Sequence, residues 1–197
     1  TRMALKEALA MGADEAYLLM DQAFEGSDTL ATSRVLAAAV RKIGRYDLIL
    51  CGEMTLDGLS AQVGPRVAEL LGIPQVTYAR SIKVEGDRVV VERDLEEESE
   101  VVEAPMPALI TVVREINEPR IPSLLSIMKA SRKEIKVWGR EDLGLSAEEV
   151  GSAGSAVKVL DVRAPPMERK RIIIKAETDE EAAEKLVERL ISDGVLR

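Results

Sequence analysis

Histidine is absent from this chain of 197 residues, and cysteine occurs once, as Cys51. The missing histidine removes the commonest general base near neutral pH and the usual nitrogen ligand of zinc. A single cysteine leaves no partner for an internal disulfide. Histidine-dependent triads and histidine-ligated metal sites are therefore excluded, and a bound cofactor is the more economical source of any reactivity.

Excess basic charge and long apolar runs are also lacking. The chain carries 27 Lys and Arg residues against 35 Asp and Glu residues, a net charge of -8, which gives no general electrostatic reason to bind nucleic acid or an anionic membrane. No apolar run is long enough to span a bilayer, and no signal-peptide pattern is present. We expect a cytoplasmic protein that binds no nucleic acid.

Helical and strand patterns alternate along the first part of the chain. Apolar spacing predicts a helix that ends at Gly12, and a short strand, "EAYLLM", follows it. A second helix is expected to start at Ser27 or Asp28 and to end at Gly44. The next strand, "YDLILCG", is apolar throughout, as a strand covered on both faces should be. This order predicts a parallel sheet in an α/β fold.

Beyond Pro74 the pattern changes to strands. The segment "QVTYARSIKVEGDRVVVERDL" alternates and turns at residues 85–87, which predicts an antiparallel hairpin. The acidic run "LEEESEVVEA" is expected to form a solvated turn and edge strand, and "PALITVV" a buried strand. From Gly139 onward the composition favours an extended arm, followed by an amphipathic helix capped by Thr178 or Asp179.

The stretch "GEMTLDGLSAQVG" directly follows a strand and leads into a helix. It offers several backbone N–H groups, with the Ser60 hydroxyl, at the positive end of that helix, an arrangement that suits a phosphate. It matches neither the Walker loop nor GxGxxG, because its glycines fall at positions 52, 58 and 64 and no lysine follows. The pattern alone leaves a nucleotide site and an ordinary capped turn equally open.

The preceding helix start, "SDTLATS", provides a second candidate. Thr29, Thr32 and Ser33 could donate hydrogen bonds to a phosphate or ribose, although such clusters are more often helix caps. Both clusters follow parallel strands, where open α/β sheets usually bind ligands. We expect them to lie at the same edge of the sheet.

Several longer segments occur in a distinctive order: "ALAMGAD", "DGLSAQVGP", "GDRVVVERD", "NEPRIPSLLSIMKASRKEI", "DLGL" and "APPMERKR". On these the chain resembles the β subunit of electron-transfer flavoprotein, a heterodimer that passes electrons between dehydrogenases and a further acceptor. The resemblance implies an α/β fold: a parallel-sheet, Rossmann-like nucleotide-binding domain with an added antiparallel hairpin and a C-terminal extended arm plus helix. It assigns residues 1–138 to an incomplete adenine-nucleotide-binding domain. Residues 139–197 would form an arm and terminal helix that pack on the α subunit.

The resemblance also implies cofactors. The redox FAD would lie mainly on the α subunit, and the β subunit would hold a second FAD or an AMP. The loop "DGLSAQVGP" is similar to D-G-D-T-A-Q-V-G-P of electron-bifurcating members, which favours FAD, although Leu59 and Ser60 stand where those members carry Asp and Thr. The implied nucleotide-binding residues are Thr29, Thr32, Asp57, Gly58, Ser60, Ala61, Gln62, Val63 and Gly64. No side chain would be catalytic.

Two further positions match partner-binding residues of that family. Leu124 stands where an exposed leucine anchors partner dehydrogenases, such as an acyl-CoA dehydrogenase; the alternative is a leucine folded into the core. Asp94 stands where a carboxylate meets an arginine of the α subunit; the alternative is one more exposed acidic residue. The implied downstream acceptor is a quinone oxidoreductase or ferredoxin, and NADH is an alternative donor.

Family members carry an early strand with a Val-Lys-x-Val-Pro motif before "ALAMGAD", which this sequence lacks, so the first domain is expected to be incomplete. Two functions of other classes stay open beside the electron carrier. One is an adenine-nucleotide-binding α/β enzyme with Asp57 as a Mg²⁺ ligand, and the other is a stand-alone nucleotide sensor. The missing histidine and loop lysine weigh against the enzyme.

Overall fold

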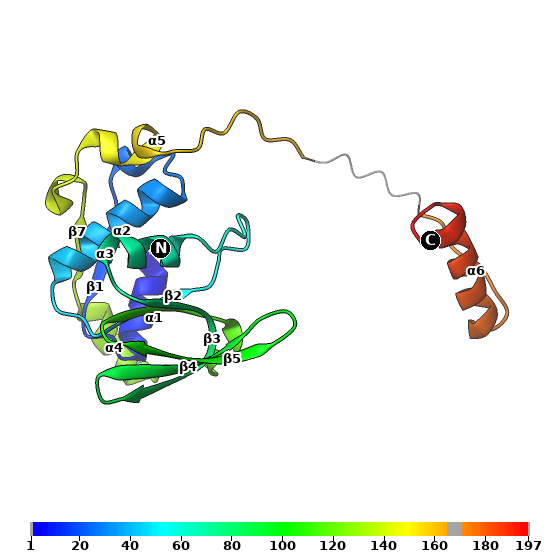
Figure 1. Ribbon diagram of the computed structural model, residues 1–197, viewed down its shortest axis with the longest axis horizontal. Coiled ribbons are helices and arrows are strands. Elements are labelled where there is room, and N and C mark those ends of the chain that lie inside the picture. The colour runs from blue at the N-terminus through cyan, green and yellow to red at the C-terminus, as the bar shows by residue number, and fades with distance from the viewer. Residues whose placement is uncertain (1, 165–170, 197) are drawn as a thin grey trace. The chain divides into compact units, whose positions relative to one another are not determined.

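Short strands and helices alternate in the computed structural model, which describes residues 2–164 and 171–196 (Figure 1). The elements in chain order are α1 (Arg2–Met11), β1 (Ala16–Leu19), η1 (Gln22–Phe24), α2 (Thr29–Ile43), β2 (Leu48–Gly52), α3 (Val63–Leu71), β3 (Gln75–Glu85), β4 (Arg88–Asp94), β5 (Ser99–Pro105), β6 (Ala108–Val112), η2 (Arg114–Ile116), α4 (Leu124–Arg132), β7 (Ile135–Trp138), η3 (Glu141–Leu143), η4 (Ala147–Glu149), α5 (Gly151–Gly154) and α6 (Asp179–Ser192).

A five-stranded sheet has the strand order β2-β6-β3-β4-β5. Within it β2, β6 and β3 run parallel, whereas β3, β4 and β5 form an antiparallel meander. The turn between β3 and β4 contains Gly86, whose φ of 65° lies in the left-handed region that glycine adopts without strain. The predicted α/β class and the added hairpin are confirmed, and the acidic run supplies edge strand β5 as expected.

A separate pair of parallel strands, β1 and β7, forms a two-stranded sheet with Leu19 opposite Trp138. Among the described strands β1 does not pair with β2, so the parallel strands expected in one sheet occur as two groups. The β1–β7 pair joins residues far apart in the sequence. Local apolar patterns predict that each strand exists but do not encode which partner it takes.

Three apolar clusters hold the first part of the chain together. One joins the strands of the five-stranded sheet and includes Val89, Val91 and Ile110, all fully buried. A second packs Val67 and Ala68 of α3 against Leu109 of β6, with α2 alongside, and the third joins α1, β1 and α4. Packing of α3 on β6 places the start of that helix beside the end of β2.

Helices α1 and α4 are joined by two lysines that reach in opposite directions. Lys6 Nζ of α1 donates to the carbonyl oxygens of Ala130, at 3.0 Å, and Lys133, at 2.6 Å, where α4 ends. Lys133 Nζ in turn donates to the carbonyl oxygen of Ala13, at 2.7 Å, just beyond α1. Each ammonium therefore satisfies carbonyls at the negative end of the other helix.

Contacts divide the chain into two units, residues 1–158 and 159–197. The first unit contains every described strand. The second contains α6, whose first turn is capped by Thr178: its Oγ1 accepts from the Glu181 amide at 3.2 Å, as predicted. Most of "APPMERKR", residues 165–170, lies outside the described residues.

Residues 139–158 correct one expectation. The composition from Gly139 onward favours an extended arm, but the structure forms η3, η4 and α5 there, and α5 packs against α2. Helices of three or four residues are too short to show a helical period in the sequence. The assignment of the remaining arm and of α6 to packing on another subunit stays a prediction.

Candidate functional site

The start of α3 leaves hydrogen-bond donors unused. Its N-cap residue, Gln62, has helical backbone angles and makes no side-chain capping bond. The amides of Val63 and Gly64 have no acceptor among the described residues, and Pro65 has no amide hydrogen. The positive end of α3 therefore presents free N–H groups, the feature that phosphate-binding helix starts share.

Gly64 brings this helix start close to the sheet. It is buried, and a Cβ added there would lie 2.5 Å from Thr111 Cγ2 on β6 and 3.5 Å from Leu109 Cδ2. Thr111 is itself fully buried and cannot turn away into solvent. A glycine at this position therefore permits the close approach of α3 to β6.

The loop before α3 is held by its own polar groups. The Gly58 amide donates to Asp57 Oδ1 at 2.7 Å and lies 3.3 Å from Thr55 Oγ1, and the Leu59 amide donates to the Thr55 carbonyl at 3.1 Å. Leu59 and Ala61 have φ values of 46° and 51°, which residues with a side chain rarely adopt. Hydrogen bonds from Thr55 and then Gly58 lower the pKa of Asp57, so its carboxylate is ionised near neutral pH.

The two predicted clusters meet although β1 and β2 belong to different sheets. Thr29 Oγ1 on α2 donates to Gln62 Oε1 at 3.0 Å. Ser33 Oγ donates to the Thr29 carbonyl at 2.6 Å and reaches the Val63 carbonyl at 3.3 Å. Ser33 is completely buried, and its hydroxyl joins α2 to α3, which is a structural role of the kind that the sequence left open beside ligand binding.

Thr32 lines a pocket of about 240 Å³, whose other walls are Leu19, Phe24, Ser27, Val35 and Leu36. The Ser27 hydroxyl is already engaged, since it donates to the Phe24 carbonyl at 2.7 Å. The Thr32 hydroxyl has no partner among the described residues. The sequence did not single out Phe24 as a site residue, because one aromatic side chain after a strand carries no periodic signal.

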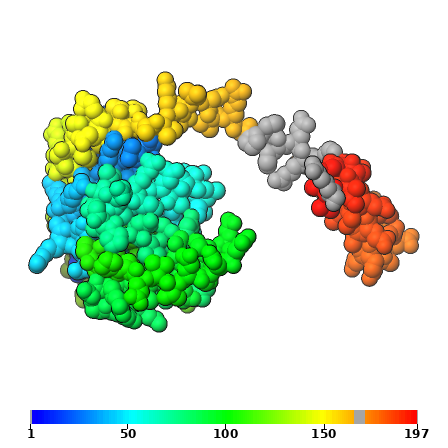
Figure 2. All heavy atoms as spheres, in the orientation of Figure 1, coloured from blue at the N-terminus to red at the C-terminus, as the bar shows by residue number. Residues whose placement is uncertain are grey.

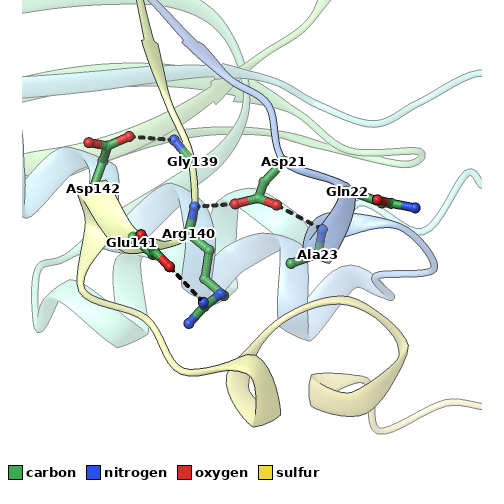
Figure 3. A pocket seen from close by; sticks show the side chains of 7 residues that line it. All are labelled: Asp21, Gln22, Ala23, Gly139, Arg140, Glu141 and Asp142. Carbon is green, nitrogen blue, oxygen red and sulfur yellow. Dashed lines mark hydrogen bonds and ion pairs between the residues drawn. The ribbon is translucent and has the colours of Figure 1, made fainter.

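A larger pocket, about 590 Å³, lies where η1 meets the chain after β7 (Figure 3). Asp21 accepts there from the amides of Ala23, at 2.9 Å, and Arg140, at 2.8 Å, and these bonds lower its pKa. The Gly139 amide donates to Asp142 at 2.8 Å. The carboxylates of Asp21 and Asp142 and the amides of Gly139 and Arg140 are thus engaged with one another. Within residues 2–164 and 171–196, no group of three His, Cys, Asp or Glu side chains could hold a metal ion, around Asp57 or elsewhere.

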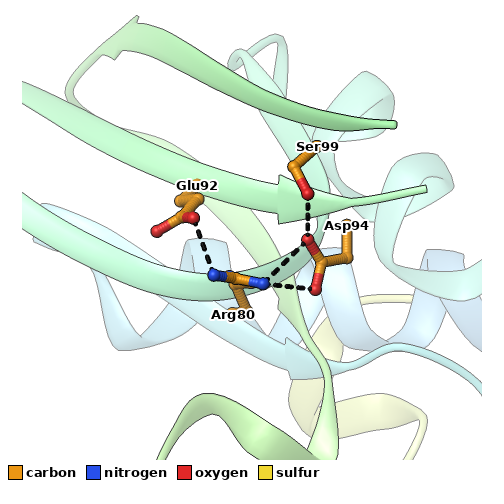
Figure 4. A network of polar contacts seen from close by, with 4 residues as sticks. All are labelled: Arg80, Glu92, Asp94 and Ser99. Atoms are coloured by element: carbon orange, nitrogen blue, oxygen red, sulfur yellow. Dashed lines mark hydrogen bonds and ion pairs between the residues drawn. The ribbon is translucent and has the colours of Figure 1, made fainter. Parts of the chain in front are cut away.

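Asp94 lies in a polar network at the end of β4 (Figure 4). Arg80 Nη1 contacts both of its carboxylate oxygens, at 2.9 and 3.2 Å, and Ser99 Oγ donates to it at 2.7 Å. Arg80 also pairs with Glu92 at 2.9 Å. Ser99 and then Arg80 lower the pKa of Asp94. The tip between β4 and β5 projects from the sheet in green (Figure 2), and it directly follows Asp94 in the chain.

Leu124 is the first residue of α4 and is 81% exposed, so it is not the core leucine of the alternative interpretation. Ser123 caps the helix by accepting from the Ser126 amide at 3.2 Å. Other large apolar side chains near Leu124 are also exposed: Ile121, Leu125, Ile127 and Met128. An exposed cluster of this kind on a short helix is typical of an interaction surface.

Cys51 lies at the end of β2 and is half-buried. Burial raises the pKa of its thiol, so the thiolate that a nucleophile requires is disfavoured near neutral pH. The structure therefore gives no support to a catalytic role for this cysteine.

The parallel strands β2, β6 and β3 place this chain in the α/β class, whose members usually bind ligands at the carboxyl ends of their strands. The uncapped start of α3, which follows β2, lies at such a strand end. Residues 1–143 match the electron transfer flavoprotein domain. The chain belongs to the electron transfer flavoprotein family and is similar to its β subunits.

The relatives cover nearly the whole chain. It is 47% identical to electron transfer flavoprotein subunit beta of Thermoanaerobacterium thermosaccharolyticum over 98% of this chain and 74% of the relative. The subunit of the same name from Megasphaera elsdenii is 44% identical over the same shares. Subunit CarD of the caffeyl-CoA reductase-Etf complex of Acetobacterium woodii is 45% identical over 94% of this chain and 71% of the relative. None of the described helices combines the length and apolarity needed to cross a membrane.

Proposed function

We propose that this chain is the β subunit of a heterodimeric electron-transfer flavoprotein, which accepts electrons from a dehydrogenase or NADH and delivers them to a quinone oxidoreductase or ferredoxin. Family membership and the names of its relatives support this role. FAD, when bound, supplies the one- and two-electron chemistry. The part of this chain is to bind and orient an adenosine nucleotide and to dock partner proteins.

The observation that carries the nucleotide site is the open start of α3. Its free amides at Val63 and Gly64 suit the phosphates, and the Ser60 hydroxyl and the amide of Ala61 lie directly before them in the loop. Asp57 and Gly58 shape that loop through their mutual hydrogen bond. The residues present therefore fit a phosphate-bearing ligand.

The start of α2 suits the rest of the nucleotide and not its phosphates. Asp28, whose carboxylate caps that helix, already places a negative charge there. Its Oδ1 accepts from the amides of Leu30 and Ala31, so these N–H groups are not free for a phosphate as those of Val63 and Gly64 are. We assign Thr29 and Thr32 to the rest of the nucleotide, with Gln62 linking them to the phosphate end.

We favour FAD over AMP as this second nucleotide, because the loop "DGLSAQVGP" resembles that of electron-bifurcating members. The relative named as part of a caffeyl-CoA reductase complex supports a role beside a reductase. The decisive experiment is to purify the full-length protein with its α partner under mild conditions and to count FAD and AMP per heterodimer. Two FAD support an NADH-linked role, and one FAD with one AMP supports a one-flavin carrier. A lone subunit without nucleotide would overturn the proposal.

Leu124 is proposed to anchor the partner dehydrogenase. Leu124 is exposed, and its helix α4 is fixed at its carboxyl end by the Lys6 ammonium. Docking can therefore bury apolar area of this leucine at little ordering cost. We expect Leu124→Ala to slow electron transfer from the dehydrogenase about tenfold, by raising KM, and to leave the flavin content unchanged. Ser131→Ala, a surface hydroxyl of α4, is the matched control. Equal rates for the two variants would contradict the docking role.

A further inference from the structure

Asp28 makes more hydrogen bonds than a helix cap requires. Its Oδ1 accepts from the amides of Leu30 and Ala31, both at 2.9 Å, which is the ordinary capping arrangement at the start of α2. Its Oδ2 accepts from the amides of Ala156, at 2.8 Å, and Val157, at 3.1 Å. One carboxylate therefore joins the first turn of α2 to residues more than a hundred positions later in the chain.

The segment held by Asp28 is the root of the C-terminal arm. The first unit ends at Lys158, directly after the two amides that Asp28 Oδ2 accepts from. The bonds to Ala156 and Val157 are thus the final described attachment before the chain leaves this unit. This carboxylate therefore fixes the last residues of the first unit to the start of α2.

A seam of further contacts aligns the same segment. The Asp28 amide donates to Ser155 Oγ at 2.8 Å, and the Gly151 amide donates to Ser27 Oγ at 3.1 Å. Arg34 Nη1, farther along α2, donates to the Gly154 carbonyl at 3.0 Å. A Cβ on Gly151 would lie 2.3 Å from the Ala23 carbonyl oxygen, so the two stretches of backbone touch closely. These specific contacts show that residues 151–155 pack against η1 and the start of α2.

The first turn of α2, which Asp28 caps, also carries the hydroxyl groups of Thr29 and Thr32 that are proposed to bind the nucleotide. Thr29 follows Asp28 directly, and Thr32 donates its amide to the Asp28 carbonyl at 3.0 Å. A ligand held by these two threonines would order the turn that Asp28 Oδ1 caps, and the rigid carboxylate would pass that order to Oδ2 and its two amides.

We infer that Asp28 is a positioning residue that couples nucleotide binding to the ordering of the arm root at Ala156 and Val157. This inference rests on the proposed nucleotide site. When the site is occupied, the arm root is held in the bonded state seen at Ala156 and Val157, which prepares the arm for docking on the α subunit. By reciprocity, an ordered arm root raises the affinity for the nucleotide by the same factor.

The test uses Asp28→Asn in the full-length heterodimer stripped of its nucleotides. Asparagine is as good an N-cap as aspartate, so its amide oxygen keeps the bonds to Leu30 and Ala31. Its NH₂ group then faces the N–H groups of Ala156 and Val157 and cannot accept from them. The variant separates the cap from the clamp without removing either the helix or the threonines.

The measurements are AMP and FAD affinity by calorimetry and the amide hydrogen exchange of residues 155–158 with and without each nucleotide. In the parent protein we expect saturating nucleotide to slow exchange there about fivefold or more. In Asp28→Asn we expect no slowing and a loss of affinity by a similar factor. Asp21→Asn is the matched control, since Asp21 also caps a local turn with one oxygen and accepts a remote amide with the other (Figure 3), and neither bond involves residues 155–158.

Each outcome decides the matter. Nucleotide-dependent protection in the parent protein and in Asp21→Asn, but not in Asp28→Asn, supports the coupling. Binding without any change in exchange overturns the coupling while the nucleotide site stands. Absence of binding in the parent protein overturns the proposed site, and the coupling falls with it.

Discussion

The starts of α2 and α3 lie next to each other, are linked through Thr29 and Gln62, and differ in how their first amides are satisfied. At α2 the amides of Leu30 and Ala31 are satisfied from within the chain, because Asp28 accepts from both of them, and the same carboxylate accepts from two more amides in the arm root. At α3 the cap is missing, and the amides of Val63 and Gly64 have no partner among the described residues. A helix start that is complete serves the fold, whereas an incomplete one suits a ligand.

The difference also explains why the two sequence patterns could not be separated beforehand. A Ser/Asp/Thr cluster and a Gly-rich loop both precede helices, and both can cap or bind. The distinguishing fact is which donors stay free after folding, and that depends on tertiary contacts such as the bond from Ala156 to Asp28.

The strongest way to break the comparison is to displace α3. Gly64→Ala places a methyl group 2.5 Å from Thr111 Cγ2, and we expect it to lower the free energy of unfolding by about 1–3 kcal/mol. It should also reduce nucleotide affinity, because the free amides move. Gly52→Ala is the control, since a Cβ there meets nothing within 4 Å. Urea unfolding measures the free energy of unfolding of both variants. Equal values would mean that the packing of α3 does not depend on this close approach.

Removing the complete cap has the next largest effect. Asp28→Ala should cost about 1 kcal/mol of stability at neutral pH. Burial raises the pKa of Asp28, but hydrogen bonds from four backbone amides outweigh it and leave the pKa below the ordinary 3.8. Its contribution is therefore present above pH 3.8 and is lost as the pH falls through the lowered folded value.

Unfolding at pH 7 and at pH 2–3 should thus show the parent protein losing its advantage over Asp28→Ala in acid. A stability difference that stays constant between the two pH values would show that the Asp28 charge does not contribute.

The smallest effect is expected where the two helix starts meet. Thr29→Val keeps the shape of the side chain but removes the hydroxyl that bonds Gln62, at a cost of about 1 kcal/mol, or about fivefold in nucleotide affinity. Titration of the stripped heterodimer with AMP and FAD measures it, again with Ser131→Ala as the control. Unchanged affinity would separate α2 from the nucleotide site.

Local features of the fold could be predicted from the sequence. The Gly86 hairpin, the Asp28 and Thr178 caps and the acidic edge strand are all set by neighbouring residues, and all are confirmed. The partner of β1 and the packing of residues 139–158 could not be predicted. Both depend on contacts between distant segments, which no short pattern records.

The candidate site divides in the same way. The loop from Asp57 to Gly64 could be proposed from its glycines and its place after a strand. The burial of Ser33, the pairing of Asp94 with Arg80 and the pocket beside Phe24 required the folded chain. Hydroxyl and carboxylate groups look alike in a sequence whether or not the fold has already used them.

The sheet formed by β1 and β7 holds the only tryptophan of the chain, Trp138. Its ring lies 4.3 Å from that of Tyr17, and Lys42 Nζ is 5.1 Å from the ring centre. Intrinsic fluorescence excited at the tryptophan band will therefore report the small sheet, while circular dichroism is dominated by the larger sheet and the helices. Coincident transitions by the two signals would mean that both sheets unfold as one cooperative unit; an earlier fluorescence change would mark β1 and β7 as the part that opens first.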